Sequence, residues 1–182
     1  MNVIVFLLDT LFFCLISAAL LRAWLNVSRI SMVQQPGPFV MALTDWLVRP
    51  LRRGMPPAWQ RSRWDSASLI AAALLALLQA FVWVGLGAWG LSHGMGVAML
   101  WSVPVLVGKI LLKTTLQGLL VLTLGLAVLS WVQPQSPAHA WLSRLLSPVL
   151  RPLSRRIPLV GGVDLSALVL VLLLQVGLMF LG

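Results

Sequence analysis

Residues 151–166 read RPLSRRIPLVGGVDLS and connect an amphipathic segment to the last apolar run of the chain. Residues 49–68 read RPLRRGMPPAWQRSRWDSAS and show the same order of features: Arg-Pro-Leu, a basic pair, a proline, an aspartate and a serine, followed by another apolar run. This order predicts that the chain is a duplication. We place the first repeat at residues 1–91 and the second at residues 92–182, each built around a basic hinge that contains prolines.

The composition is that of a membrane protein. Of the 182 residues, 60% are hydrophobic and only 9% are charged, and the mean hydropathy is +0.99. One soluble core of this size could not bury so much apolar surface. In a soluble protein the formal net charge of +9 would suggest a nucleic-acid partner. Here the arginines gather in two loops between apolar runs, so membrane topology explains the charge and no nucleic acid is expected.

Four apolar segments are predicted to cross about 30 Å of hydrocarbon as helices that rise about 1.5 Å per residue. They lie at about residues 3–25, 66–90, 105–131 and 165–181. The N-terminus has no basic region and no small-residue cleavage site before Arg22, so the first segment is expected to be a retained span and not a signal peptide. The predicted fold class is therefore all-α, with two transmembrane helices in each repeat.

Basic residues set the predicted orientation of these spans. Six arginines lie between the first and second spans and four between the third and fourth, whereas residues 91–104 contain no Lys or Arg. The positive-inside rule puts both long loops in the cytoplasm, and both termini and the short loop outside. Because each repeat contains two spans, the repeats share one orientation and are parallel rather than inverted copies.

Both long loops contain a segment with apolar residues at helical spacing, at about residues 37–53 and 138–155. Each is predicted to be an amphipathic helix in the membrane interface. Pro148 and Pro152 leave open whether the second segment is one helix or two short pieces. The arginines have two interpretations: they only fix topology and anchor the loops, or they also bind anionic lipid headgroups or an acidic partner. The candidate binding residues are Arg49, Arg52, Arg53, Arg151, Arg155 and Arg156.

Each hinge ends in an aspartate that precedes an apolar run. A carboxylate there can cap the following helix, because it accepts hydrogen bonds from the first free N–H groups and suits the positive end of the helix dipole. It can also pair with nearby arginines, since a carboxylate has several acceptor sites. The candidate hinge and cap residues are Asp65, Gly161, Gly162 and Asp164. The expected pairs are Arg53 or Arg63 with Asp65, and Arg155 or Arg156 with Asp164.

The predicted spans also carry polar side chains in their outer halves, where an unpartnered polar group is costly. These residues are Asp9, Gln79, Lys109, Lys113, Gln117 and Gln175. Lys113 is expected to pair with Asp9, and Lys109 to reach the outer headgroups. Two interpretations are open: hydrogen bonds that fix the helices to one another, or a site for an ion or polar substrate. A single carboxylate facing two lysines favours the first, because proton and cation pathways generally carry acidic residues in series.

No catalytic or metal-binding pattern is recognisable. His93 and His139 lie alone in loops on opposite sides of the membrane, and Cys14 is the only cysteine. The pair Gly161-Gly162 lacks the strand and the Lys-Ser/Thr context of a phosphate loop. The sequence therefore predicts no enzyme activity, no cofactor and no metal site.

Taken together, these features resemble the YggT family of bacterial inner-membrane proteins, whose plastid and cyanobacterial relatives are called YlmG. The resemblance covers nearly the whole chain. It is carried by LLRAW near the start, RPLRR and DSASL in the first half, ILLKT in the third span and RPLSRRIPLVGGVDLS in the second half. The first copy departs from the family pattern because it lacks glycines before Asp65, so only the second hinge is expected to follow that pattern.

The resemblance implies a membrane role without an established reaction. Bacterial members of the family are linked to osmotic-stress tolerance with potassium uptake, and plastid members to cytochrome b assembly and nucleoid distribution. These roles favour a small scaffold or assembly factor of the bacterial inner membrane, which contacts lipids and other membrane proteins. The alternative is an ion-uptake component, a channel formed when several copies assemble around Asp9, Lys109, Lys113 and Gln117, because four spans are too few for a pathway in one chain.

Overall fold

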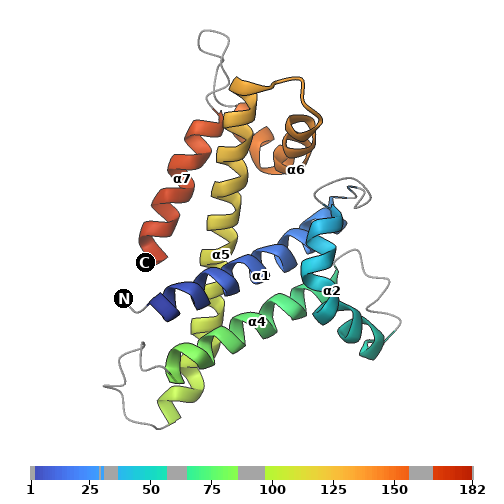
Figure 1. Cartoon of the computed structure of the whole chain (residues 1–182). Coiled ribbons are helices and arrows are strands. Elements are labelled where there is room, and N and C mark those ends of the chain that lie inside the picture. Colours follow the sequence, from blue (N-terminus) through green and yellow to red (C-terminus); the bar gives the residue numbers. More distant parts are fainter. Residues whose placement is uncertain are drawn as a thin grey trace. The chain divides into compact units, whose positions relative to one another are not determined.

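A computed structural model describes residues 3–28, 30, 37–56, 65–85, 97–155 and 166–181. Within these ranges the chain forms α-helices and no β-strand, which confirms the predicted all-α class (Figure 1). The helices are α1 (Val3–Val27), α2 (Gly37–Gly54), α4 (Ser66–Gly85), α5 (Val97–Val132), α6 (Pro137–Ser154) and α7 (Ser166–Leu181).

Three of these helices are long and apolar enough to cross a membrane. They comprise α1, residues 66–84 of α4, and residues 103–132 of α5. The fourth predicted span corresponds to α7, which is apolar but only 16 residues long. At about 1.5 Å per residue it measures roughly 24 Å, which is shorter than a typical hydrocarbon core of about 30 Å. By length and composition, three helices of the described chain are therefore able to cross a membrane.

Helix α5 begins earlier than the sequence predicted. Its first residue is Val97, whereas the expected span began at Val105 and residues 91–104 were expected to form a loop. The expected span began directly after Pro104, a residue type that removes one backbone hydrogen bond and crowds the preceding turn of a helix. The helix continues through Pro104, as apolar helices often do when neighbouring groups accommodate the missing bond.

Helices α2 and α6 occupy the two segments for which interfacial helices were predicted. Helix α6 starts with Pro137 after the N-cap residue Ser136, whose hydroxyl oxygen accepts a hydrogen bond from the backbone N–H of His139 at 3.2 Å. It continues without a break through Pro148 and Pro152, so the alternative of two short pieces is wrong.

The described chain divides into two compact units, residues 1–114 and 115–182. The predicted boundary between the repeats, at residues 91 and 92, lies outside the described residues. The first unit contains α1, α2, α4 and the beginning of α5, and the second contains the rest of α5 with α6 and α7.

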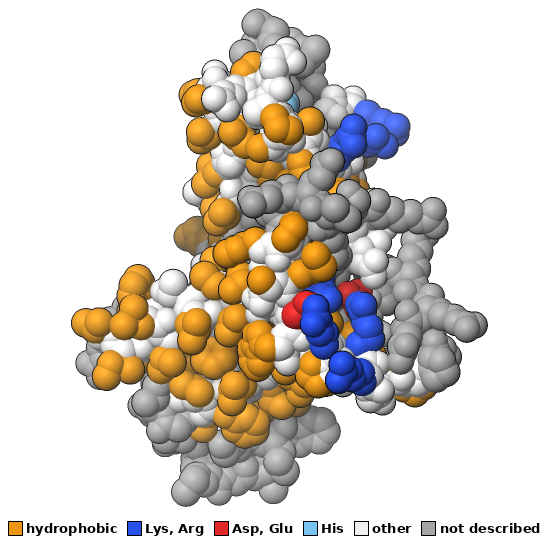
Figure 2. All heavy atoms as spheres, turned by 45° about the vertical axis from the view of Figure 1, so that its right-hand side comes forward, with side chains coloured by type: hydrophobic (Ala, Val, Ile, Leu, Met, Phe, Trp, Pro, Cys, Tyr) orange, Lys and Arg blue, Asp and Glu red, His pale blue; other side chains and the backbone are white. Residues whose placement is uncertain are grey.

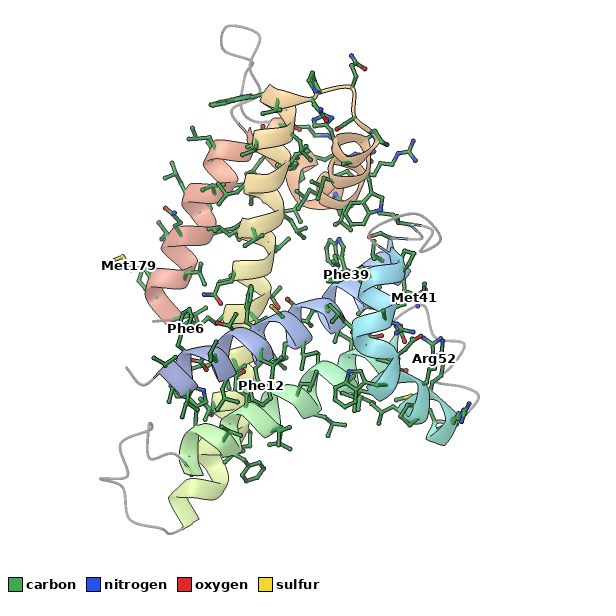
Figure 3. All side chains as sticks on the ribbon, in the orientation of Figure 1. Phe6, Phe12, Phe39, Met41, Arg52 and Met179 are labelled. Carbon is green, nitrogen blue, oxygen red and sulfur yellow. The ribbon has the colours of Figure 1, made fainter. Side chains whose placement is uncertain are left out.

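In the first unit, α1 and α4 run antiparallel and side by side (Figure 1). Their core combines large residues of α1 with small residues of α4, and Phe12 lies at this contact (Figure 3). The buried residues are Phe12, Ile16, Ala19, Ala72, Leu75 and Ala76. Alanines let two helix backbones approach closely, which is how apolar helices gain packing energy in a membrane. Helix α2 adds Val48, which packs on Ala67 and Ala71 at the beginning of α4.

In the second unit, α6 packs on α7, and Leu145 and Leu146 of α6 are fully buried. A glycine permits a close contact between α5 and α7. A Cβ atom added at Gly177 would lie only 3.3 Å from Leu116 Cδ1. Close helix packing therefore depends on small residues in this unit as well.

The α1–α4 core predicts the effect of enlarging Ala76. Ala76→Leu should destabilise the protein by about 1–3 kcal/mol, because added methylenes in a packed core force neighbouring side chains and backbone apart. Ala73→Leu is the matched control, since Ala73 lies on the same helix and is only half-buried. Reversible unfolding in mixed micelles measures the difference, and equal stability of the two variants would contradict this packing.

Candidate functional site

The most tightly organised polar group in the described chain surrounds Arg22, near the end of α1. Its side chain is 7% exposed, although it belongs to an apolar helix. Nη1 donates hydrogen bonds to Asp45 Oδ1 at 2.7 Å and to Thr44 Oγ1 at 2.8 Å. Nε lies 4.0 Å from Asp65 Oδ2. One guanidinium thus links α1 to α2 and to the residue immediately before α4.

A hydrogen bond within α2 orients the hydroxyl of Thr44 for this contact. Its hydroxyl donates to the carbonyl oxygen of Val40, one turn earlier, at 2.7 Å. The lone pairs of the hydroxyl oxygen are then free to accept from Arg22. Val40, Thr44 and Val48 are the buried positions of α2 at a spacing of four residues, so the same helix face carries the packing and the polar contact.

Asp65 is the second carboxylate of the group and caps α4. Oδ1 accepts from the backbone N–H of Ser68 at 3.4 Å, and Oδ2 accepts from the Ser68 hydroxyl at 2.7 Å. Arg52 Nη2 reaches both oxygens, at 3.0 and 3.1 Å. The side chain of Asp65 is 5% exposed. One carboxylate therefore serves as a helix cap and as a partner for two cations.

The structure pairs Asp65 with Arg52, whereas the sequence suggested Arg53 or Arg63. Successive residues of a helix point about 100° apart, so only one member of the Arg52-Arg53 pair can face Asp65. Arg53 is exposed and makes no ion pair with any residue the structure describes. Arg63 lies outside the described residues.

Asp45 lies between two cations. Besides Arg22, it accepts from Arg49 one helical turn later, with Arg49 Nη2 at 2.7 Å from Oδ2. Burial by itself would raise the pKa of Asp45, but the hydrogen bond and charge of Arg22, followed by those of Arg49, outweigh it and hold that pKa below its ordinary value. Asp45 is therefore ionised at neutral pH and balances charge on both α1 and α2.

We call this group the Arg22 network. It comprises Arg22, Thr44, Asp45, Arg49, Arg52, Asp65 and Ser68. Figure 2 shows its acidic side chains next to a group of basic ones on one face. Both carboxylate oxygens of Asp45 and of Asp65 already accept from groups of the protein. The geometry of the network therefore suits holding the helices together. Among the described residues no group of three His, Cys, Asp or Glu side chains could hold a metal ion.

Sequence analysis missed Arg22, Thr44 and Asp45. Two signals could have found them. An ionisable residue inside an apolar run needs a partner, which applies to Arg22. The spacing of Asp45 and Arg49 is the four-residue spacing at which helix side chains meet.

The remaining candidate arginines are Arg151, Arg155 and Arg156. Arg151 and Arg155 are exposed at the end of α6. Neither forms an ion pair within the described parts of the chain. Arg156, Gly161, Gly162 and Asp164 fall outside the described residues, and with them the expected pair between Arg155 or Arg156 and Asp164.

Within the first unit, one residue of the predicted intramembrane polar layer, Asp9, contacts two residues of α4. Asp9 Oδ1 accepts from Trp83 Nε1 at 2.8 Å and from Gln79 Nε2 at 3.3 Å, which joins α1 to α4. The expected ion pair between Lys113 and Asp9 is absent from the described structure. Lys109 and Lys113 are exposed on α5. Gln117, which is half-buried, and Gln175, which is exposed, belong to the second unit.

The match to a family model and the matches to known proteins agree with one another. The family model described as CCB3/YggT matches residues 1–86 and 107–182. The "Uncharacterized protein YggT" of Escherichia coli (strain K12) is 35% identical over 179 residues, which cover 97% of this chain and 87% of that protein. The "Uncharacterized protein in proC 3'region" of Vibrio alginolyticus is 32% identical over 184 residues, which cover 100% and 95% of the two chains. No solved structure matches the chain.

The Arg22 network predicts a large difference between two arginine substitutions. Arg22→Gln should lower the free energy of unfolding by about 2–3 kcal/mol, because it removes a buried partner, although Asp45 keeps Arg49 and Asp65 keeps Arg52. Arg53→Gln, the control, should change it by no more than about 0.5 kcal/mol. Unfolding in mixed micelles tests this, and a similar loss in both variants would show that Arg22 contributes no more than a surface charge.

The lowered pKa of Asp45 also predicts a pH dependence. A carboxyl whose pKa is lower in the folded than in the unfolded state stabilises the fold above its unfolded pKa of about 3.9, and this contribution disappears as pH falls through the folded pKa. Asp45→Asn should therefore melt below the wild-type protein at pH 7, and the gap should shrink at pH 3. Melting temperatures in detergent at the two pH values test this. An equal difference in melting temperature at the two pH values would mean that the charge of Asp45 does not contribute to stability.

Proposed function

The chain belongs to the CCB3/YggT family, and from this premise we propose that it is a non-catalytic scaffold or assembly factor of the bacterial inner membrane, with a role in osmotic-stress tolerance. In this proposal α1, α4, α5 and α7 cross the membrane as two parallel repeats, with both termini in the periplasm. Helices α2 and α6 lie on the cytoplasmic surface.

The observation that carries the proposal is the attachment of α2 to two apolar helices through the Arg22 network. Its inward face holds Val40, Thr44 and Val48, and its outward side leaves Phe39 and Trp46 65% and 59% exposed. The indole N–H of Trp46 donates to the carbonyl oxygen of Leu43 at 2.8 Å, so the ring presents apolar surface without an unmet donor. A rigidly held helix with exposed aromatic and basic residues suits an organising surface at the headgroup level.

The arginines divide into two groups within this proposal. Arg49 and Arg52 are paired with carboxylates of the protein. Arg53, Arg151 and Arg155 are exposed and are the better candidates to meet anionic lipid or an acidic partner.

A second function, an oligomeric channel for potassium or another ion, is favoured by one observation. Lys109 and Lys113 are exposed on a helix that is otherwise apolar enough to cross the membrane. Charged side chains at such a place usually face a cavity or a partner. Against a cation pathway, Asp9 is the only acidic residue of the described apolar helices.

Affinity purification from native membranes in mild detergent, followed by mass spectrometry, tests the scaffold. We expect a stoichiometric membrane protein to co-purify with the wild-type chain and to fall by about tenfold with Arg151→Gln/Arg155→Gln. Loss of about 1.4 kcal/mol of binding energy gives this factor. Unchanged recovery of the client in that variant, or no client at all, would contradict the proposal.

The double variant Lys109→Gln/Lys113→Gln is the matched control, because it removes the same charge from α5. The scaffold predicts that it keeps the client. The channel predicts instead that this variant alone changes ion flux into liposomes that contain the purified protein.

A further inference from the structure

We propose that the face of α5 that carries Lys109 and Lys113 is an intramembrane interface between two copies of this chain, in which Asp9 of the partner subunit is the counter-ion. The inference is independent of the scaffold role, because it concerns how the protein pairs with itself and not what it binds.

The two lysines lie on the side of α5 that faces away from its own unit. Leu106 and Thr114 are buried, and Val107, Ile110 and Leu111 pack against the α1–α4 core. Lys109 and Lys113 are exposed and lie one helical turn apart. Neither ammonium group forms a hydrogen bond or an ion pair with any residue that the structure describes.

From the packing of α5 we infer that these lysines lie near the depth of the membrane centre. The α1–α4 core that α5 contacts lies at the middle of both helices, at Phe12 and Ile16 of α1 and at Leu75 and Ala76 of α4. Both lysines are within three residues of Ile110 or Leu111, which corresponds to about 5 Å along the helix. Half the hydrocarbon thickness is about 15 Å. We therefore expect Lys109 to stay below the headgroups that it was predicted to reach, and both cations to need a partner within the membrane.

A suitable anion with one free oxygen lies in the same unit. Asp9 is half-buried. Both of its hydrogen bonds, from Gln79 and Trp83, go to Oδ1. Oδ2 accepts from no residue in the described part of the chain. One chain thus presents a cationic pair and a carboxylate oxygen that do not meet each other.

A two-fold symmetric pair of copies would bring the lysines of one copy to the carboxylate of the other. In an isologous pair, the surface of each copy contacts the same surface of the other, so one complementary contact occurs twice. Lys113 of one copy then faces Asp9 of the partner subunit, and the reverse contact forms at the same time. Opposite charges attract far more strongly in hydrocarbon than in water, which favours this arrangement over two copies that each keep unpaired charges.

Charge reversal in full-length protein tests the interface. The measurement is the fraction of dimers in lipid vesicles at high dilution, counted by single-molecule photobleaching. We expect the wild-type chain to dimerise, and Asp9→Lys or Lys113→Asp to weaken dimerisation at least about tenfold, because each places like charges opposite each other.

Mixing the two single variants distinguishes this effect from misfolding. A copy with Asp9→Lys and a copy with Lys113→Asp, labelled with different dyes, present opposite charges at both contacts and should form mixed dimers at nearly the wild-type level. Failure of the mixed pair to form would overturn the proposal. So would a wild-type monomer, which would mean that a lipid phosphate or a foreign acidic helix holds the lysines. Leu78→Ala, at an exposed position of α4 that carries no charge, is the control and should leave the dimer intact.

Discussion

A single buried cation determines the arrangement of the first unit. Arg22 is buried within an apolar helix, and a charge there is tolerated only with partners that stay in place. Those partners come from α2 and from the residue before α4, and each carboxylate in turn needs its cations. Since none of these groups is stable alone in this environment, α1, α2 and the start of α4 assemble as one structure. The position of α2 therefore follows from charge balance as much as from apolar packing.

Local patterns in the sequence were sufficient to locate the described helices, apart from the start of α5. Apolar spacing located α2 and α6 to within about a residue, and the residue type at Asp65 indicated a helix cap. The Arg22 contacts span 22 to 43 positions of the chain and depend on which helices pack together, so no local pattern contains them. The same applies to Asp9, whose partners Gln79 and Trp83 could be paired with it only once α1 and α4 were known to run antiparallel. The start of α5 was placed eight residues too late, and the helix in fact continues through Pro104 despite the backbone hydrogen bond that proline removes.

The arginines illustrate why composition alone does not assign function. Positive charge in the loops was the basis for predicting membrane topology, yet the structure shows neighbouring arginines in different roles. Arg52 is held by a buried carboxylate, and the next residue, Arg53, is exposed. Exposed arginines such as Arg53 are the candidates for a binding surface, because arginines such as Arg52 already pair with carboxylates of the protein. Membership of the CCB3/YggT family is therefore compatible with a scaffold whose contacts involve few of its many basic residues.

The difference in length between α5 and α7 has a consequence for the surrounding lipid. Helix α5 has 36 residues, about 54 Å, and α7 has 16, about 24 Å, and the two approach closely at Leu116 and Gly177. If both cross the bilayer, the long helix is accommodated by tilting or by projecting from the surface. The short helix is matched when the hydrocarbon thins around it, at a cost of fractions of a kcal/mol per Å. Thinning relieves the mismatch of the short helix but increases that of the long one, so this pair places two opposing demands on the thickness of the lipid around it.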